Sequence, residues 1–373
     1  MSSGPLYFDH NATTPLLPEV VEAMLPFLTT HFGNPSSGHA YGRTAKDAVE
    51  KARAQVAALV GATSDEVIFT SGGTEATALA LRGTLRPGVR EKLISTRVEH
   101  PATARVLDSL ERAGHEVHRV AVRTDGLLDL VALDATLNGA RWLSVIHAHN
   151  ETGVLQPLPE LLALTKKHGA WLHADASQSA GKVEVKDFDL LTLAAHKLYG
   201  PKGVGALVKR RHVELHAQQL GAGHERGLRA GTENVASIVG FGAACVAAHR
   251  DLAELAARLL NLRERLETKL RAEVPGLIIA AQNSVRLPNT TYAVFPNVSG
   301  TALLARAADQ LAASTGSACH DGHEEAPAVL RELGLDERFA LGAVRLTTGR
   351  HTSEAEVDQA VATLVSCWRF LKG

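Results

Sequence analysis

The sequence predicts an α/β fold, in which a large domain built on a mainly parallel β-sheet is followed by a smaller α+β domain. Three observations predict it. From about Asp65 to Arg210, short apolar runs rich in β-branched residues alternate with longer amphipathic stretches, as in parallel sheets covered by helices on both faces. After about Ala244 a long helical pattern replaces this alternation. The composition, 45% hydrophobic and 21% charged, is that of an ordinary globular protein.

The first part of the chain is expected to alternate between strands and helices. Each strand is a short run of apolar and β-branched side chains, and each helix carries apolar residues three or four apart. Strands are expected at Val67–Thr70, Lys92–Ser95, Val117–Val122, Trp142–His147, Ala170–Ala174, Leu190–Ala194 and Val204–Val208, with helices at Thr74–Leu81, Ala102–Ala113 and Leu158–His168. Ligands of such sheets bind beyond the carboxyl ends of the strands, so chemistry is expected in the loops that follow these runs.

The second part is expected to begin with one long helix, because leucine, alanine and charged residues recur at helical spacing from His249 to Glu273. Strands are then expected at Leu277–Ala280, Thr291–Phe295 and Ala343–Thr347, and helices at Thr301–Gln310 and Ser353–Leu371. The change of pattern places the domain boundary near residue 250. We therefore expect a large domain at 15–250 and a small domain formed by 1–14 and 251–373.

Charge and cysteine content exclude several classes of protein. Lys and Arg total 39 and Asp and Glu total 40, a net charge of -1, so neither a nucleic acid nor a membrane is expected as a partner. No apolar stretch approaches the ~20 residues that span a bilayer, and the start of the chain lacks the pattern of a secretory signal. Three cysteines are too few for a disulfide framework, which favours a reducing, cytoplasmic location.

A glycine-rich turn opens the first helix that follows a strand. In the segment Thr70–Thr77, TSGGTEAT, two glycines including Gly73 allow a ligand to approach the backbone, and the helix N-terminus presents free N–H groups to an anion. Thr74 adds a hydroxyl group. The alternative is an ordinary turn in which Thr74 caps the helix. A P-loop is excluded, because the Lys-Ser/Thr ending is missing.

Two further strand ends carry charged side chains. Asp175 ends an apolar strand, where a carboxylate can hold a proton on the pyridinium nitrogen of a cofactor; otherwise it caps the next helix. Lys197 follows another buried strand, directly after His196. Desolvation there lowers the pKa of a lysine and makes its amine a nucleophile, whereas the alternative is a surface lysine. Lys202, in the Pro-Gly turn, is the nearest rival.

Together, the glycine-flanked threonine, the aspartate and the His-Lys pair outline a pyridoxal 5'-phosphate (PLP) site, with the phosphate at Thr74, the ring nitrogen at Asp175 and a Schiff base at Lys197. The chain resembles the class V aminotransferase superfamily and, within it, the cysteine desulfurases of the NifS/IscS type. The matching motifs run in family order: YFDHNATTP from Tyr7, FGNPSSGH from Phe32, TSGGTEAT from Thr70, VEHPA from Val98, HNETGV from His149, HADASQSAGK from His173, AHKLYGPKGVGAL from Ala195, GAGHERGLRAGTEN from Gly221, LPNT from Leu287, STGSACH from Ser314 and VRLTTGRHT from Val344.

The resemblance implies fold type I of the PLP-dependent transferases, with a seven-stranded sheet, and a role for each matching residue. His100 would stack on the cofactor ring and transfer protons, while Arg345 and Asn34 would hold the substrate carboxylate. The implied cofactor-binding residues are Gly73, Thr74, His100, Asn150, Asp175, Gln178, His196, Lys197 and, reaching the neighbouring subunit of a homodimer, Thr232. Asn150 would also contact the substrate. Without the resemblance, a core histidine, a surface ion pair, a turn residue and a cap explain His100, Arg345, Asn34 and Thr232.

Cys319 lies in a run of small and polar residues that should bury little surface. We expect this segment, about 314–327, to be mobile, which suits a nucleophile that takes up a sulfur atom and carries it outward. Cys245 and Cys367 are expected to be structural. His320 and His323 can help to ionise Cys319. Their spacing also resembles that of metal ligands, but no second ligand cluster accompanies it, so no metal is expected.

The sequence departs from the family pattern at two places. Ala194 stands where many desulfurases have a serine that donates to the cofactor phosphate, and a hydrogen bond to a charged group contributes ~1.5–3 kcal/mol. Many desulfurases continue after the cysteine with Thr-Ser, whereas this chain has a stretch from His320 to His323 that is more similar to selenocysteine lyases. The second departure leaves the choice between sulfur and selenium open.

The resemblance implies a homodimeric cysteine desulfurase that converts L-cysteine to L-alanine. Catalysis would rest on Lys197, His100 and Cys319, and Cys319 would pass its persulfide to an acceptor for iron–sulfur cluster assembly or tRNA thiolation. Three alternatives stay open: a selenocysteine lyase acting on L-selenocysteine, another class V transferase or lyase, and a non-catalytic scaffold. The intact Lys197, Asp175 and His100 argue against a scaffold.

Overall fold

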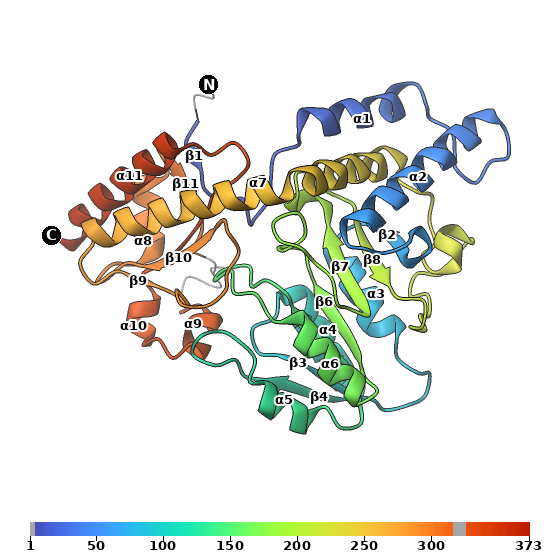
Figure 1. Cartoon of the computed structure of the whole chain (residues 1–373), viewed down its shortest axis with the longest axis horizontal. Helices are drawn as coiled ribbons and strands as arrows, with labels where there is room; N and C mark the ends of the chain where they lie inside the picture. Colours follow the sequence, from blue (N-terminus) through green and yellow to red (C-terminus); the bar gives the residue numbers. More distant parts are fainter. Residues whose placement is uncertain (1–3, 316–325) are drawn as a thin grey trace.

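The computed structural model describes residues 4–315 and 326–373, and its centre is a seven-stranded sheet (Figure 1). The strand order is β2-β8-β7-β6-β5-β3-β4, and β8 alone runs antiparallel to its neighbours. The strands are β2 (Val67–Thr70), β3 (Lys92–Thr96), β4 (Glu116–Val120), β5 (Ala140–Ile146), β6 (Trp171–Asp175), β7 (Leu190–Ala194) and β8 (Gly205–Lys209). The predicted mainly parallel sheet is confirmed.

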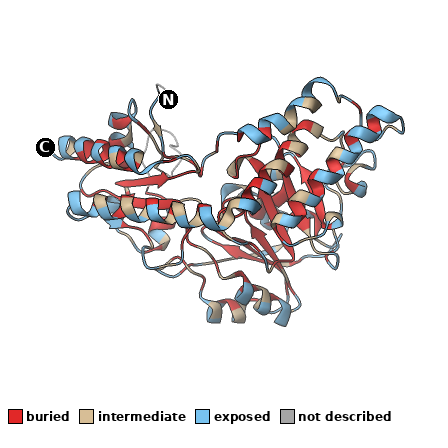
Figure 2. Cartoon of the chain, turned by 45° about the horizontal axis from the view of Figure 1, so that its top comes forward, coloured by how far each residue is buried: buried red, intermediate tan, exposed pale blue. Residues whose placement is uncertain are grey.

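Helices cover both faces of this sheet, so all of its strands except the edge strand β4 are largely buried (Figure 2). Leu93 and Trp142 face α3 (Gly73–Gly83) and α4 (Pro101–Arg112), whereas their neighbours Ile94 and Leu143 belong to the core on the other face. That second core is covered by α1 (Pro18–Thr29), α2 (Ala40–Leu59), α5 (Leu130–Thr136), α6 (Leu158–Lys167) and the first half of α7 (Val235–Glu273). Consecutive apolar residues in one strand therefore serve opposite faces.

The long helix α7 begins at Val235, well before the predicted start at His249. The side chain of Asn234 accepts from the Ser237 N–H and caps it. The first half of α7 is largely buried, mostly against α1 and α2. Apolar residues therefore occupy most of its circumference, and the sequence lacks the amphipathic period by which a surface helix is predicted. The predicted domain boundary near residue 250 falls inside this continuous helix.

Among the described residues, α7 is also the one helix long and apolar enough to cross a membrane by length and composition. Half of its most apolar window is buried inside the protein, and core helices of soluble proteins pass the same test. The sequence analysis expected no apolar stretch near the length that spans a membrane, and it therefore underestimated the apolar length of α7.

The second half of α7 carries the smaller part of the molecule, which appears at the left of Figure 1. Leu255, Leu259, Leu262 and Leu266 of α7 pack into a separate core with Phe8 and the three-stranded sheet β12-β10-β9. The remaining elements are β1 (Leu6–Tyr7), β9 (Ile278–Ile279), β10 (Thr290–Val294), α8 (Gly300–Ala307), β11 (Leu311–Ala312), α9 (Ala328–Glu332), α10 (Glu337–Ala340), β12 (Ala343–Thr347) and α11 (Glu354–Lys372).

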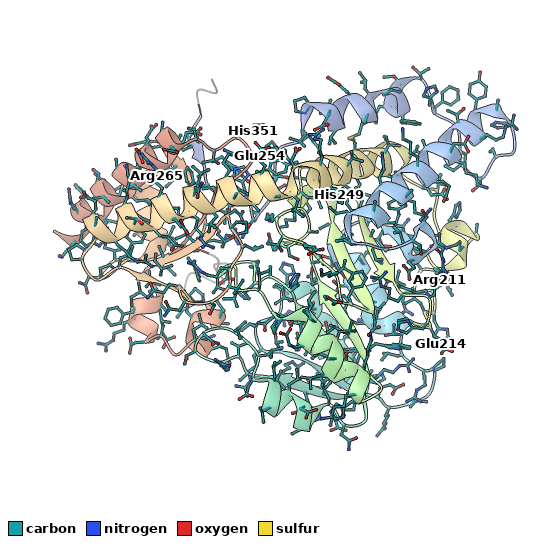
Figure 3. All side chains as sticks on the ribbon, in the orientation of Figure 1. Arg211, Glu214, His249, Glu254, Arg265 and His351 are labelled. Carbon is teal, nitrogen blue, oxygen red and sulfur yellow. The ribbon has the colours of Figure 1, made fainter. Side chains whose placement is uncertain are left out.

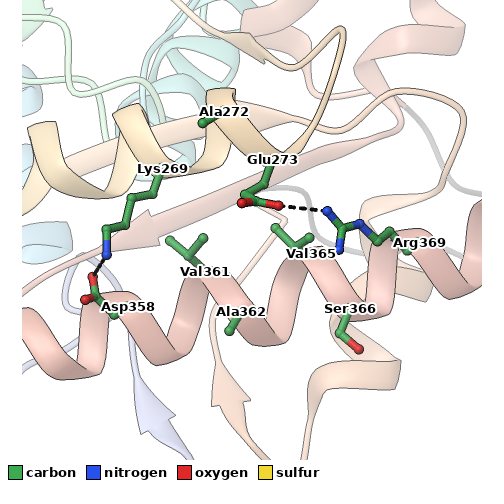
Figure 4. Close-up of a pocket in the computed structure, with 9 residues that line it drawn as sticks. All are labelled: Lys269, Ala272, Glu273, Asp358, Val361, Ala362, Val365, Ser366 and Arg369. Atoms are coloured by element: carbon green, nitrogen blue, oxygen red, sulfur yellow. Dashed lines mark hydrogen bonds and ion pairs between the residues drawn. The ribbon is translucent and has the colours of Figure 1, made fainter.

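Helix α11 packs along α7, and ion pairs line the seam between them. Lys269 pairs with Asp358 at 2.6 Å, and Glu273 with Arg369 at 2.7 Å, on either side of a groove of about 530 Å³ (Figure 4). Arg265, labelled in Figure 3, also pairs with Asp358 at 2.6 Å. This groove lies on α7 and α11, and none of the predicted site residues that the structure describes lines it.

The N-terminal segment connects the smaller part to the carboxyl ends of the large sheet. The Asn11 N–H donates to Thr347 Oγ1 of β12 at 3.1 Å, and the Asn11 side chain donates to the Asn150 carbonyl at 3.2 Å. Three residues later, the Thr14 N–H donates to the His196 carbonyl at 3.0 Å. Residues from both ends of the chain therefore meet at the edge of the sheet where the candidate site lies.

Candidate active site

A cavity of about 230 Å³ opens where β6 and β7 end and α3 and α4 begin. Ala102, Ile146, Ser177 and Ala194 contribute to its wall. Eight of the predicted site residues also line it: Gly73, Thr74, His100, Asn150, Asp175, Gln178, His196 and Lys197. Residues separated by more than a hundred positions are brought together because parallel strands end at the same edge of the sheet.

One end of the cavity is the N-terminus of α3. Gly72, which precedes the helix, has φ 155° and ψ -179°, a conformation open to glycine. A Cβ on Gly73 would lie 3.0 Å from Ser177 Oγ and 3.4 Å from the Ala194 methyl group, so the missing side chain leaves this corner open. The first N–H groups of α3 have no partner within the helix, and the helix dipole favours an anion.

Lys197 lies at the other side of the cavity, in the short 3-10 turn Ala195–Lys197 that follows β7. Its Nζ donates to the carbonyl oxygens of Asn11 and Ala12, the latter at 2.9 Å. Burial and the charge of Arg345 lower the pKa of this amine to about 8, while the charges of Asp175 and Asp9 oppose the shift. An appreciable fraction of neutral amine is therefore present near neutral pH.

Asp175 and His100 occupy the middle of the cavity. Asp175 is the last residue of β6 and its Oδ1 accepts from the Ser177 N–H at 2.9 Å, which fixes the carboxylate. His100 precedes α4, and its Nδ1 accepts from the Ala102 N–H at 3.1 Å, so the neutral ring carries its hydrogen on Nε2. Burial lowers the pKa of His100, and Asp175 opposes that shift.

His196 is neutral as well. Its Nδ1 lies 3.2 Å from Thr13 Oγ1, and burial followed by the charges of Lys197, Lys202 and Lys182 lowers its pKa to about 4. A neutral histidine can donate one hydrogen bond to an anion at the edge of the cavity without adding charge.

Arg345 of β12 is buried beside the cavity and does not line it. Its guanidinium donates to Asp9 Oδ1 at 2.6 Å and to the Asn150 carbonyl at 3.2 Å. The sequence allowed a surface ion pair for Arg345; the pair exists, but it is buried. Ser314, the first residue of the segment predicted to carry Cys319, forms a β-bridge with Arg345.

Two predicted residues that the structure describes lie elsewhere. Asn34 is exposed between α1 and α2, where its Oδ1 accepts from the Ser36 N–H at 2.9 Å, the turn role that the sequence allowed. Thr232 is exposed in the loop before α7. Neither lines the cavity of its own chain. Cys319 lies outside the described residues, as do His320 and His323. Cys245 and Cys367 are buried, and burial raises the pKa of both thiols, as expected of structural cysteines.

Several residues that contribute to the site lie in motifs that the sequence analysis quoted without assigning them a role. Asn11 supplies a carbonyl to Lys197, and Ser177 supplies a hydroxyl group to the cavity. Lys182 is buried beneath Gln178. Glu99 accepts hydrogen bonds from Thr96 and from the backbone of β5. For Ser177 and Glu99, the position directly before an assigned residue was the available signal.

The residues present fit a PLP molecule. The N-terminus of α3, with Thr74, matches a phosphate, the fixed Asp175 matches a protonated ring nitrogen, and Lys197 offers an amine of lowered pKa to an aldehyde. Among the described residues no group of three His, Cys, Asp or Glu side chains is arranged to hold a metal ion.

Comparisons with known proteins agree with this geometry. The chain is 44% identical to the cysteine desulfurase IscS of Anaeromyxobacter sp. (strain Fw109-5), over 99% of this chain and 93% of that protein. It is 41% identical to a cysteine desulfurase of Nostoc sp., over 96% and 92% of the two chains.

Solved structures give the same result. A NifS-like protein superposes with a TM-score of 0.92 at 33% identity, covering 98% of this chain and all of the other. A structure described as SspA in complex with cysteine superposes with a TM-score of 0.82 at 28% identity, covering 93% and 99% of the two chains. The family model for class-V aminotransferases matches residues 6–360. The chain belongs to the class-V aminotransferase family.

Proposed function

We propose that the protein is a PLP-dependent cysteine desulfurase, which converts L-cysteine to L-alanine. The observation that carries this proposal is one cavity that combines the amine of Lys197, the carboxylate of Asp175 and the free N-terminus of α3. Relatives of 41–44% identity over nearly the whole chain are cysteine desulfurases. PLP bound here supplies an aldehyde for the substrate amine and a ring that accepts electron density from the substrate carbon atoms.

The residues of the cavity divide the remaining work. Lys197, with a pKa of about 8, can give up and take back a proton near neutral pH. His100 is neutral and keeps its Nε2 hydrogen available, because Nδ1 is occupied by the Ala102 N–H. Asp175 holds the proton on the ring nitrogen. Arg345 is assigned to the substrate carboxylate, which has to compete with Asp9 for the guanidinium.

Cys319 is assigned as the sulfur acceptor. It follows Thr315 by four residues, at most about 14 Å of extended chain, and the Thr315 carbonyl accepts from Tyr292 Oη at 2.9 Å. In the proposed transfer the Cys319 thiolate attacks the substrate Sγ, so that an S–S bond forms and the substrate Cβ–Sγ bond breaks. The electron pair of the broken bond stays with the carbon skeleton, which takes up protons and leaves as alanine. Cys319 keeps the sulfur as a persulfide.

A homodimer is part of the proposal. Exposed apolar side chains gather on α1, on the loop that follows it and at the start of α2, among them Leu25, Leu28, Phe32 and Tyr41. Phe32 and Tyr41 stack at 5.4 Å although they are 77% and 60% exposed, which favours burial against another chain. Thr232 lies outside the cavity of its own chain, in keeping with a role in that of a second copy.

The destination of the sulfur is proposed from the family resemblance alone. We assign the persulfide to an acceptor protein in iron–sulfur cluster assembly or tRNA thiolation, in the cytoplasm. The IscS names of related proteins support the first route. Incubating the persulfidated enzyme with an iron–sulfur scaffold protein tests it, since the sulfur then moves to the scaffold and leaves Cys319 free.

The decisive experiment follows alanine formation from L-cysteine and from L-selenocysteine, with the wild type and Cys319→Ala side by side. Turnover of cysteine by the wild type alone, with bound PLP retained in both proteins, supports the proposal. Normal sulfur transfer by Cys319→Ala would contradict the role of Cys319. Turnover of selenocysteine alone would show instead a selenocysteine lyase, which the sequence from His320 to His323 resembles.

A further inference from the structure

Lys182 is a buried cation without a carboxylate partner. It follows β6 in the chain, is 6% exposed, and forms no ion pair with any acidic side chain in 4–315 or 326–373. Its Nζ instead donates to three uncharged oxygen atoms: the Gln178 carbonyl at 2.9 Å, Gln178 Oε1 at 3.2 Å and Asn11 Oδ1 at 3.5 Å. A buried charge that has only neutral acceptors destabilises the folded protein, which indicates that the hydrogen bonds of Lys182 serve a function.

These contacts determine which way the Gln178 amide faces. An ammonium group donates and cannot accept, so the atom next to Lys182 has to be Oε1 and the other atom of the amide has to be Nε2. Nε2 gives one hydrogen to the Asn11 carbonyl at 2.8 Å. Gln178 lines the cavity, and the second Nε2 hydrogen is the one left for whatever the cavity binds.

We propose that Lys182 is a positioning residue that fixes the Gln178 amide with its N–H group toward the cavity. Without Lys182 the amide can rotate and present Oε1, which repels an acceptor oxygen of the ligand. The inference rests on the proposed function for the identity of that ligand, whose phenolic oxygen is the acceptor available to an amide hydrogen.

The cations around Lys182 oppose a further positive charge. Burial, together with the charges of Lys197 and Arg345, lowers the pKa of Lys182 to about 7. His10, which also faces Lys182, is neutral because burial and Lys182 lower its pKa to about 4. These surroundings disfavour the charged form of Lys182, and its three oxygen acceptors are the contacts that oppose the shift.

The test compares the wild type with Lys182→Met, a side chain of similar length without charge or donor. Equilibrium affinity is measured from the quenching of protein fluorescence, for PLP and for a PLP analogue that lacks the phenolic oxygen. Lys182→Met should bind PLP about tenfold more weakly, the effect of one hydrogen bond, and bind the analogue as the wild type does. Lys209→Met is the matched control; Lys209 donates to the Val213 carbonyl away from the cavity, and both affinities should stay unchanged.

Other outcomes overturn one of the two proposals. Equal losses for PLP and the analogue, or no loss for either, would refute the positioning role. A wild type that does not bind PLP would refute the proposed function instead. Should Lys182→Met not fold, neutron diffraction from deuterium-exchanged crystals of the PLP-loaded wild type locates the deuterons of Gln178. Deuterons facing the ligand support the proposal, and an oxygen facing it overturns the proposal.

Discussion

Replacing Glu99 by glutamine should change how the stability of the protein depends on pH. Glu99 Oε1 accepts from the Thr96 hydroxyl at 2.7 Å and from the Ile146 N–H at 2.9 Å. Its Oε2 is buried with no partner among the described residues. Burial, with a contribution from the charge of Asp175, raises the pKa of Glu99 from 4.5 to about 8. The carboxyl group is therefore protonated in the folded protein at neutral pH.

The sign follows from where the proton binds more tightly. Because the folded pKa lies above the unfolded one, the folded protein holds the proton and stability falls as the pH rises from about 4.5 to about 8. This cost reaches about 3 kcal/mol at pH 7, since each pKa unit between the ordinary value and the pH contributes about 1.4 kcal/mol. Glutamine has nearly the same shape and no charge to lose, so it avoids the cost.

The assay is urea denaturation of the apoprotein between pH 4.5 and pH 8. Glu99→Gln and the wild type should have similar free energies of unfolding near pH 4.5, and the variant should become the more stable by about 3 kcal/mol at pH 7. Glu91→Gln is a control of opposite sign. Hydrogen bonds from Arg86 lower the pKa of Glu91 below 4.5, so Glu91→Gln should destabilise the protein by a nearly constant amount from pH 4.5 to pH 8, and the difference should shrink only below about pH 4.5. Parallel curves for Glu99→Gln and the wild type would refute the assignment of a protonated carboxyl group.

Four further predictions concern the site and the dimer. The rate at which the apoprotein takes up PLP should rise with pH through about 8, where the Lys197 amine loses its proton, and Lys197→Arg should show no such rise when absorbance is followed. In a binding titration, Ser177→Ala should weaken PLP binding about tenfold but leave the affinity for pyridoxal, which has no phosphate, unchanged. Adding Ala194→Ser to this variant should restore the affinity for PLP. Arg345→Lys should raise KM for L-cysteine about tenfold with a smaller effect on kcat, because a bidentate contact to the carboxylate is lost. Phe32→Asp should shift the protein from dimer to monomer in sedimentation velocity, and an unchanged dimer would place the interface elsewhere.

Most strands were predictable from sequence because each is a short, mainly apolar run between polar turns; the edge strand β4, EVHRV, is an exception. The bounds expected for β2, β7 and β12 coincide with those observed. Helices α1 and α2 were not predicted. The buried face of α2 is narrow and consists largely of alanine and other small residues, so the contrast between its apolar and charged residues is weak. The start of α7 was missed for the opposite reason, because helix surfaces buried on several sides lose the amphipathic period that marks a helix.

Within the site, residues at strand ends were predictable and the contacts behind them were not. Asp175 and Lys197 follow apolar runs, and their chemistry is specific enough to identify from spacing. The acceptors of Lys197 belong to Asn11 and Ala12, nearly two hundred residues away, and no local pattern connects them. No local pattern predicts the pairing of Arg345 with Asp9 either. Because of this pairing, a substrate carboxylate has to compete with Asp9 for the guanidinium.

Several of the 18 histidines in the chain are buried around the cavity, where they form hydrogen bonds without adding charge. His147, His149 and His173 are buried near the ends of β5 and β6, and burial lowers their pKa values to between about 3 and 4. These rings therefore form hydrogen bonds without adding charge; His173, for example, bridges Ser144 and Thr192. The charge of the cavity region is then set by the cations Lys182, Lys197 and Arg345 against the anions Asp9 and Asp175. The excess of positive charge favours a ligand that carries a phosphate, and neutral histidines keep that excess from growing to a level at which the three buried cations would destabilise the fold.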